Sequence, residues 1–380
     1  MKLSCLQEKL DRGLKVVSRA VPTKGTLPHL SNVLLATDQG RLKLAATNLE
    51  VAISCWIGAK IEDEGSITVP ANLLAEFVRS LPNDRIDLTL SERSRTLHLR
   101  CARFEANVKG IDAEEFPTIP SAGDGFRIQV DAATLHDSIA QVAFAAAADD
   151  SRPVLTGVLV TFSGDTMTMV AADGFRMAVK TATLPSSAEH DASVIVPARA
   201  LRELGRIVAD TEEPVEVSLT PNRNQALFRV GNVELVSRLI EGQFPDYKKI
   251  MPPPSPNRVI VSTGEFLNAN RAASIFARDN SNIVRLQFTP GEEGLTPGKM
   301  TITATSAEVG DNVGEIDASV AGQPPQIAFN CRYLDELLKV LEKSSQLSLE
   351  VTSSSSPGTF RPVGDEQYLH VIMPMCRDRP

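Results

Sequence analysis

The sequence has 380 residues, of which 42% are hydrophobic and 23% charged, a composition typical of a soluble globular protein with two or three domains. No run of about 18 apolar residues occurs and the N-terminus is charged too early for a secretory signal, so we expect a cytoplasmic protein without a membrane span. The net charge of −8 argues mildly against a nucleic-acid partner. The five cysteines are far apart, which argues against a disulfide framework or a zinc site.

A helix followed by strands is predicted to open each of three stretches of the chain. The first two helices have apolar stripes at helical spacing: Leu10, Leu14 and Val17, then Leu135, Ile139 and Val142. The third, around Phe266 and Ala273, is less regular, but Ser262 to Glu265 supplies a capping box. The predicted strands that follow are residues 32–35 and 42–46, 157–160 and 166–171, and 284–288 and 300–304.

A strand running into a second helix then recurs. Residues 66–71 (SITVPA) are echoed by residues 193–198 (SVIVPA) and more weakly by residues 326–331 (QIAFNC). Counted from Pro70, Pro197 and Asn330, apolar residues recur at the same helical positions: Leu74, Phe77 and Leu81; Leu201, Leu204 and Val208; Leu334, Leu337 and Leu341. Each helix precedes an alternating strand, at residues 86–90, 215–219 and 347–351.

These repeats predict an α+β protein with three tandem domains of two helices and about eight strands each. The expected domains are residues 1–122, 126–252 and 256–380, separated by turn-rich linkers.

The second predicted helix of each repeat, here called the closing helix, carries basic residues opposite its apolar stripe. Counted again from Pro70, Pro197 and Asn330, the ninth residues are Arg79, Arg206 and Lys339, here called the basic column. The second residues are Asn72, Arg199 and Arg332. A solvated helix face is the simpler explanation for any one helix, but three copies in an acidic protein favour a surface that faces phosphates. Acidic residues such as Asp335 and Glu336 share these helices. No base-reading motif occurs, so a DNA contact would be independent of sequence.

No motif for nucleotide binding, metal binding or hydrolysis occurs, and the five histidines do not cluster. Asp149 and Asp150 are interpreted as a polar loop. We therefore expect a non-catalytic protein without metal or cofactor.

Four segments together resemble the bacterial DNA polymerase III beta subunit, or sliding clamp, family. They are residues 26–35 (TLPHLSNVLL), 171–179 (AADGFRMAV), 244–249 (FPDYKK) and 368–375 (YLHVIMPM), and they follow the family's order along the whole chain. The resemblance implies a processivity factor of the replicative polymerase. Such a factor is a head-to-tail homodimeric ring that encloses duplex DNA, with six domains and with helices lining the hole.

The resemblance also implies a hydrophobic groove for short peptides of client proteins: the polymerase III alpha subunit, the clamp loader, other polymerases and repair proteins. The matching positions are Arg152, Leu155, Ala172, Gly174, Phe175, Arg176, Met177, Pro245, Lys249, Ile250, Asn330, Tyr333, Val371, Ile372, Met373, Pro374 and Met375. Without the resemblance, Met177, Met373 and Met375 are more simply interpreted as core residues. The ending departs from the family pattern, because Cys376 precedes Arg377–Pro380.

For DNA, the residues expected to face the duplex are Lys24, Arg79, Arg152, Arg199, Arg206, Arg332 and Lys339. At the dimer interface the resemblance implies that the strand near residues 104–109 meets the partner's strand near residues 300–304. Phe104, Ile275 and Phe276 would be its apolar anchors. Two other hypotheses remain open from the sequence: a repeat-domain scaffold and a multi-domain enzyme with a site between domains.

Overall fold

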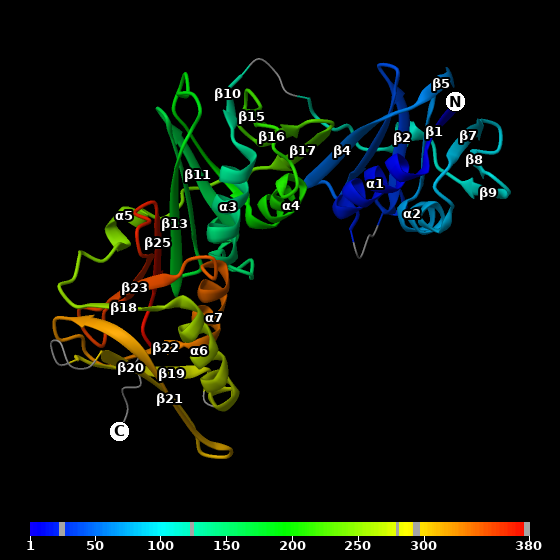
Figure 1. Cartoon of the computed structure of the whole chain (residues 1–380). Helices are drawn as coiled ribbons and strands as arrows, with labels where there is room; N and C mark the ends of the chain where they lie inside the picture. Colours follow the sequence, from blue (N-terminus) through cyan, green and yellow to red (C-terminus); the bar gives the residue numbers. More distant parts are fainter. Residues whose placement is uncertain (23–26, 122–124, 279–280, 292–296, 376–380) are drawn as a thin grey trace. The chain divides into compact units, whose positions relative to one another are not determined.

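The structure is a computed structural model that describes residues 1–22, 27–121, 125–278, 281–291 and 297–375 (Figure 1). By their internal contacts these residues form two compact units. Unit 1 comprises residues 1–136, 184–190 and 200–239, and unit 2 comprises residues 137–183, 191–199 and 240–380.

The order of elements repeats three times. The first repeat runs β1 (Lys2–Leu6), α1 (Gln7–Val17), β2 (Asn32–Asp38), β3 (Arg41–Thr47), β4 (Val51–Gly58), β5 (Lys60–Asp63), β6 (Ser66–Pro70), α2 (Ala71–Ser80), β7 (Arg85–Ser91), β8 (Thr96–Cys101) and β9 (Phe104–Lys109). The second runs β10 (Arg127–Val130), α3 (Ala132–Val142), β11 (Gly157–Ser163), β12 (Thr166–Ala172), β13 (Arg176–Thr183), β14 (Ala192–Pro197), α4 (Ala198–Val208), β15 (Val215–Leu219), β16 (Gln225–Val230) and β17 (Val233–Arg238). After a short helix α5 (Tyr247–Ile250), the third runs β18 (Arg258–Ser262), α6 (Thr263–Ala277), β19 (Ile283–Thr289), β20 (Gly298–Ser306), β21 (Gly310–Ala321), β22 (Ile327–Asn330), α7 (Cys331–Val340), β23 (Gln346–Glu350), β24 (Gly358–Pro362) and β25 (Tyr368–Ile372). The predicted α+β organisation of two helices among eight or nine strands is therefore confirmed.

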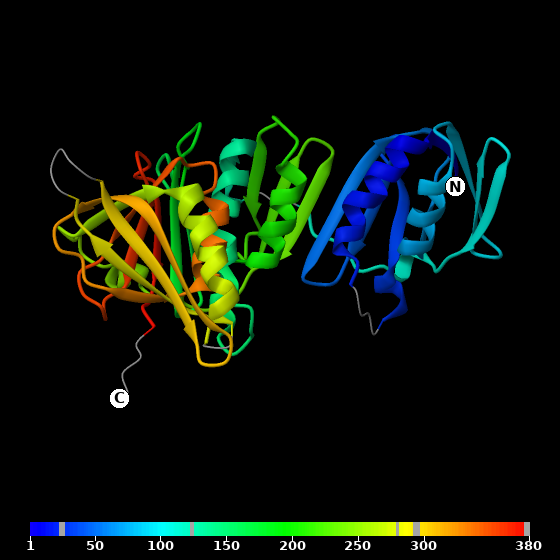
Figure 2. The same ribbon diagram turned by 60° about the horizontal axis from the view of Figure 1, so that its bottom comes forward.

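The helices form where the sequence predicts them and bury the predicted stripes. In unit 1, α1 and α2 lie side by side against a sheet (Figure 2). Leu10, Leu14 and Val17 of α1 are fully buried. α1 approaches β3 so closely that a Cβ on Gly13 would lie 2.7 Å from a methyl carbon of Leu44, so only glycine fits there.

One detail differs from the predicted helix faces. Phe77 is only partly buried, and the interior position is taken by Val78, which lies one helical turn after the buried Leu74. Pro70 stands directly before the helix, at its N-cap position. The predicted cap at Ser262 is observed, since its hydroxyl oxygen accepts from the Glu265 N–H at 3.4 Å.

Each repeat joins the next through one antiparallel strand pair. In unit 1, β4 of the first repeat pairs with β17 of the second, within a sheet ordered β10-β15-β16-β17-β4-β3-β2-β6. A smaller sheet of unit 1 is ordered β5-β1-β7-β8-β9. In unit 2, β13 of the second repeat pairs with β25 of the third, within a sheet ordered β14-β11-β12-β13-β25-β24-β23-β18-β21-β20-β19-β22.

Several strand edges have no ladder partner among the described residues, and two of them, on β9 and β21, matter for the predicted contact between chains. β9 pairs only with β8, and residues 310–317 of β21 pair only with β20. The expectation that the strand near residues 300–304 meets another chain is wrong. Those residues form β20, which is hydrogen-bonded to β19 on one side and to β21 on the other, so it has no edge to offer.

Candidate functional site

The basic column predicted on the closing helices is exposed, but each of its members has an acidic neighbour. In unit 1, Arg79 lies 3.9 Å from Asp11, and Arg206 forms an ion pair with Glu203. In unit 2, the Lys339 ammonium lies 2.6 Å from Asp335. The side chains of the three basic residues remain 53–66% exposed. They can therefore still contact an external anion, with part of their charge offset by the neighbouring carboxylate.

The other predicted DNA-facing residues vary in position. Arg199 and Arg332 are exposed at the starts of α4 and α7. Arg152 is exposed too, and its Nη2 donates to the carbonyl oxygen of Asp173 at 3.0 Å. Lys24 lies outside the described residues.

The charge of the six long helices differs in sign from that of the rest of the chain. α1, α2, α3, α4, α6 and α7 together carry ten Lys and Arg and eight Asp and Glu. The rest of the sequence carries 29 of the 39 basic residues and 39 of the 47 acidic residues. Positive charge is thus concentrated on the helices of an acidic protein, as a phosphate-facing helical surface requires.

A cluster of buried apolar residues lies in unit 2, where the second and third repeats meet along β13 and β25, at the positions predicted for the groove. Its buried floor comprises Leu155, Val170, Met177, Val179, Ile195, Phe244, Leu369 and Val371. Partly buried side chains pack against this floor: Ala147, Val154, Leu159, Ala172, Ile240, Tyr247 and Met251. Met177 and Val371 are direct neighbours across the β13–β25 ladder, so the floor depends on that pairing.

The predicted groove residues divide between this floor and an exposed rim. Leu155, Met177, Val371 and Ile372 are buried, and Ala172 is partly buried. Phe175, Ile250 and Met373 are apolar and 57%, 51% and 42% exposed. Pro245 and Lys249 are exposed beside them in sequence, and Pro374 and Met375 are partly buried. Asn330 caps α7, since its side-chain oxygen accepts from the Arg332 N–H at 2.9 Å.

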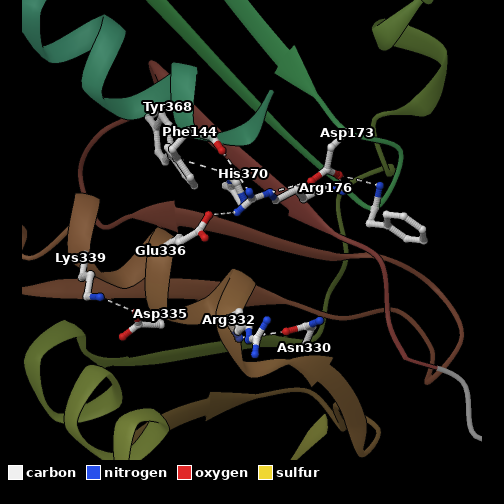
Figure 3. A network of polar contacts seen from close by, with 11 residues as sticks. Phe144, Asp173, Arg176, Asn330, Arg332, Asp335, Glu336, Lys339, Tyr368 and His370 are labelled. Atoms are coloured by element: carbon white, nitrogen blue, oxygen red, sulfur yellow. Dashed lines mark hydrogen bonds and ion pairs between the residues drawn. The ribbon is translucent and has the colours of Figure 1, made fainter. Parts of the chain in front are cut away.

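Arg176 lies beneath the rim with its side chain only 7% exposed (Figure 3). Its Nε donates to Asp173 at 3.0 Å, its Nη1 to Glu336, and its Nη2 to the carbonyl oxygen of Phe144 at 3.0 Å. The rings of Phe144 and Tyr333 lie 5.4 Å and 4.6 Å from the guanidinium carbon. These partners compensate the guanidinium for its burial.

The turn at residues 173–175 shapes the rim above Arg176. Asp173 accepts from the backbone N–H groups of Phe175 and Arg176 at 2.9 Å and 3.0 Å. Gly174 has φ +92°, and a Cβ there would lie 2.8 Å from Nη2 of Arg152. The turn therefore favours glycine for its backbone conformation. The N–H of Met373 donates to the carbonyl oxygen of Phe175 at 2.8 Å, which ties the C-terminal segment to this turn.

Several residues of this region were not predicted as part of the groove. Phe244 and Tyr247 stand in a segment that carried the family resemblance, and their large apolar rings were the available signal. Phe144 and Glu336 contact Arg176 from other elements, and no local pattern in the sequence points to that contact.

The described residues contain no group of three or more His, Cys, Asp and Glu side chains able to hold a metal ion. Cys5, Cys55, Cys101 and Cys331 are buried free thiols, and burial raises the pKa of Cys55 to about 11. Asp149 is exposed in a turn and accepts from the Ser151 N–H at 3.0 Å, as expected for a polar loop. None of the described helices combines the length and apolarity needed to cross a bilayer.

The sequence matches three domains of one protein family, in order. Residues 1–120 match the DNA polymerase III beta subunit, N-terminal domain, residues 129–246 its central domain, and residues 248–376 its C-terminal domain. The beta sliding clamp of Synechococcus elongatus is 33% identical over 378 residues, covering 99% of each chain. The crystal structure of the DNA polymerase sliding clamp from Bacillus subtilis superposes with a TM-score of 0.92 at 29% identity, covering 99% of each chain. The DNA polymerase III subunit beta from Pseudomonas aeruginosa gives a TM-score of 0.90 at 28% identity, covering 99% of this chain and 100% of the other.

Proposed function

Because the chain belongs to the DNA polymerase III beta subunit family, we propose that it is the processivity factor of a replicative DNA polymerase. Two copies close into a ring around duplex DNA, slide without sequence preference and tether client proteins. The observation that carries this proposal is the match of all three domains, in order, over nearly the whole chain. The protein acts in the cytoplasm as a non-catalytic subunit, with domains at residues 1–122, 126–252 and 256–380.

The strand pairing within the chain supports a head-to-tail dimer. The third strand after the opening helix of one repeat pairs with the last strand of the next repeat at both junctions, as β4 with β17 and β13 with β25. The same rule assigns residues 310–317 of β21 to β9 of a partner copy. Both edges have free backbone donors and acceptors on one side among the described residues, which is the arrangement that strand addition uses.

Charge and apolar exposure favour the same pairing. β21 carries Asp311, Glu315 and Asp317 and no basic residue, whereas the β8–β9 hairpin carries Arg100, Arg103 and Lys109 and only Glu105. Phe104 on β9, and Ile275 and Val313 on α6 and β21, are 53%, 57% and 61% exposed. Phe276 beside Ile275 is partly buried. Complementary charge around apolar anchors gives a specific interface.

A closed ring explains how a weakly basic helical surface can stay on DNA. Phosphate contacts alone give a Kd of about 10⁻⁴–10⁻⁶ M at physiological salt, too weak to hold a protein on DNA for long. A closed ring leaves only when an interface opens or the DNA ends, so weak contacts at Arg79, Arg199, Arg206, Arg332 and Lys339 permit sliding. We place Lys24 and Arg152 near the duplex as well.

The groove suits short peptides of client proteins. The exposed Phe175, Ile250 and Met373 over the apolar floor offer adaptable contacts for leucine and phenylalanine side chains. Burial of one or two such side chains contributes about 1.5–3 kcal/mol each, which gives exchangeable binding. The clients are the polymerase III alpha subunit, the clamp loader, other polymerases and repair proteins.

Primer extension tests the proposed function. On a primed circular template with excess competitor DNA, the protein together with a clamp loader and a polymerase III core should lengthen the products of a single binding event. Products of unchanged length, from a protein shown to be folded, would refute a processivity role.

A further inference from the structure

Glu336 lies on α7, outside the predicted groove, yet it holds the arginine beneath that groove. Its Oε2 accepts from Nη1 of Arg176 (Figure 3). The Glu336 side chain is 47% exposed and the Arg176 side chain 7% exposed, so the contact joins a buried cation to a helix surface. In the sequence Glu336 is only an acidic residue on a helix expected to face DNA.

Every nitrogen of the Arg176 guanidinium donates to an oxygen of the protein, on Asp173, Glu336 and Phe144. Aromatic rings of Phe144 and Tyr333 lie close to its carbon atom. A guanidinium held in this way is a structural tie rather than a group free to bind a peptide.

Asp173 connects Arg176 to the rim residues Phe175 and Met373 through hydrogen bonds. The carboxylate that accepts from Nε of Arg176 also accepts from the backbone N–H of Phe175. The carbonyl oxygen of Phe175 in turn accepts from the N–H of Met373. One chain of contacts therefore runs from Glu336 to the two exposed apolar side chains at the rim.

We propose that Glu336 is a positioning residue for the client groove. Through Arg176 and Asp173 it holds the Phe175–Met373 rim in the shape that receives the apolar side chains of a client peptide. This inference rests on the proposed function and deepens it. The helix α7 also carries Arg332 and Lys339, which are expected to face DNA. The affinity of the groove thus depends on a residue of the helix on the DNA side.

Peptide binding tests this role directly. The probe is a fluorescein-labelled synthetic peptide with a Leu-Phe pair, followed by fluorescence polarisation on the full-length protein. Glu336→Ala should weaken binding about five-fold, a modest effect because the pair is partly exposed. Glu336→Gln keeps an oxygen acceptor and should retain more of the affinity.

The matched control is Asp335→Asn, which removes the same charge one residue away. Asp335 pairs with Lys339 and Arg271 and has no contact with Arg176, so binding should stay within about two-fold of wild type. Equal losses in the two variants would mean that the charge of the helix, and not the contact with Arg176, determines affinity. Unchanged binding of Glu336→Ala would also overturn the inference.

A double-mutant cycle separates positioning from general destabilisation. Asp173→Asn and Glu336→Ala both act through Arg176, so their combined effect should fall clearly short of the product of the single effects. Independent effects, or a loss of affinity that follows a fall in melting temperature, would contradict the proposal. A wild-type protein that fails to bind the peptide would refute the proposed function instead, which keeps the two failures distinguishable.

Discussion

His370 is a buried imidazole on β25, beneath the groove. Its ring stacks on Phe144 with centroids 5.4 Å apart and planes 12° apart. Its Nδ1 lies 3.4 Å from the Tyr368 hydroxyl, and its Nε2 has no hydrogen-bond partner among the described residues. Burial, helped by the charge of Arg176, lowers the pKa of His370 to about 3. The folded protein therefore keeps this ring neutral.

The neutral ring predicts a specific loss of stability in acid. The unfolded chain binds a proton on His370 near pH 6.5, whereas the folded chain does so only near pH 3. Stability is therefore lost as the pH falls through this window, by about 2 kcal/mol at pH 5 relative to neutral pH. His370→Phe keeps the ring stack and removes the titration, so it should lack this part of the loss. Urea unfolding of both proteins at the two pH values measures it. Equal pH dependence would contradict the assignment.

At the residue scale, the sequence predicted apolar side chains better than polar contacts. The floor residues Leu155, Met177 and Val371 were predicted from the family resemblance. The ties of Arg176 to Phe144 and Glu336 could not be predicted, because they join residues 32 and 160 positions apart. Such contacts depend on how β13, β25 and α7 come together, which no local pattern encodes.

The helices combine an apolar face that packs on a sheet with an opposite face that carries weakly offset positive charge. The acidic neighbours Asp11, Glu203 and Asp335 reduce the local field without burying the cations. Such a surface favours brief phosphate contacts over tight ones. This suits sliding, in which each contact must break as readily as it forms.

Reversal of the basic column tests which face meets DNA. Replacing Arg79, Arg206 and Lys339 by Glu should weaken DNA binding and reduce the slope of log K against log salt by about 2–3, since each lost phosphate contact contributes about 0.9. The matched control reverses one exposed arginine of each repeat outside the helices: Arg93, Arg223 and Arg285. Filter binding over a salt series measures both. Equal effects of the two sets would show that the column has no special role.

At the element scale, strand positions were predictable but strand neighbours were not. The predicted segments 32–35, 86–90 and 215–219 all lie within observed strands, because alternation reveals one buried face. Alternation does not reveal which edge is hydrogen-bonded to which. The segment at residues 300–304 was therefore correctly predicted as a strand and wrongly assigned to the dimer contact.

For the whole molecule, the repeated junction rule leaves one strand edge free at each end. These are β9 in the first repeat and residues 310–317 of β21 in the third, which have no junction partner among the described residues. Pairing them between two copies closes the assembly through two equivalent contacts. The threefold repeat was visible in the sequence, but this edge assignment required the observed pairing of β4 with β17 and β13 with β25.

Ile275→Asp tests that closure. A charge at an exposed apolar anchor of the interface should convert dimers to monomers, because an unpaired carboxylate would be buried there. Leu49→Asp is the control, since Leu49 is similarly exposed, at 48%, and stands between β3 and β4, outside β9, α6 and β21. Size-exclusion chromatography with light scattering gives the mass. Dimers of Ile275→Asp as stable as those of wild type would refute the assigned interface.

Retention on closed circular DNA distinguishes a protein that encloses DNA from one that binds its surface. The protein is loaded onto a nicked circular plasmid, isolated by gel filtration at moderate salt, and the plasmid is then cut once with a restriction enzyme. If the protein encloses DNA, it should stay with the circle and be released when the DNA becomes linear. Equal retention on circular and linear DNA, or release from both, would contradict it.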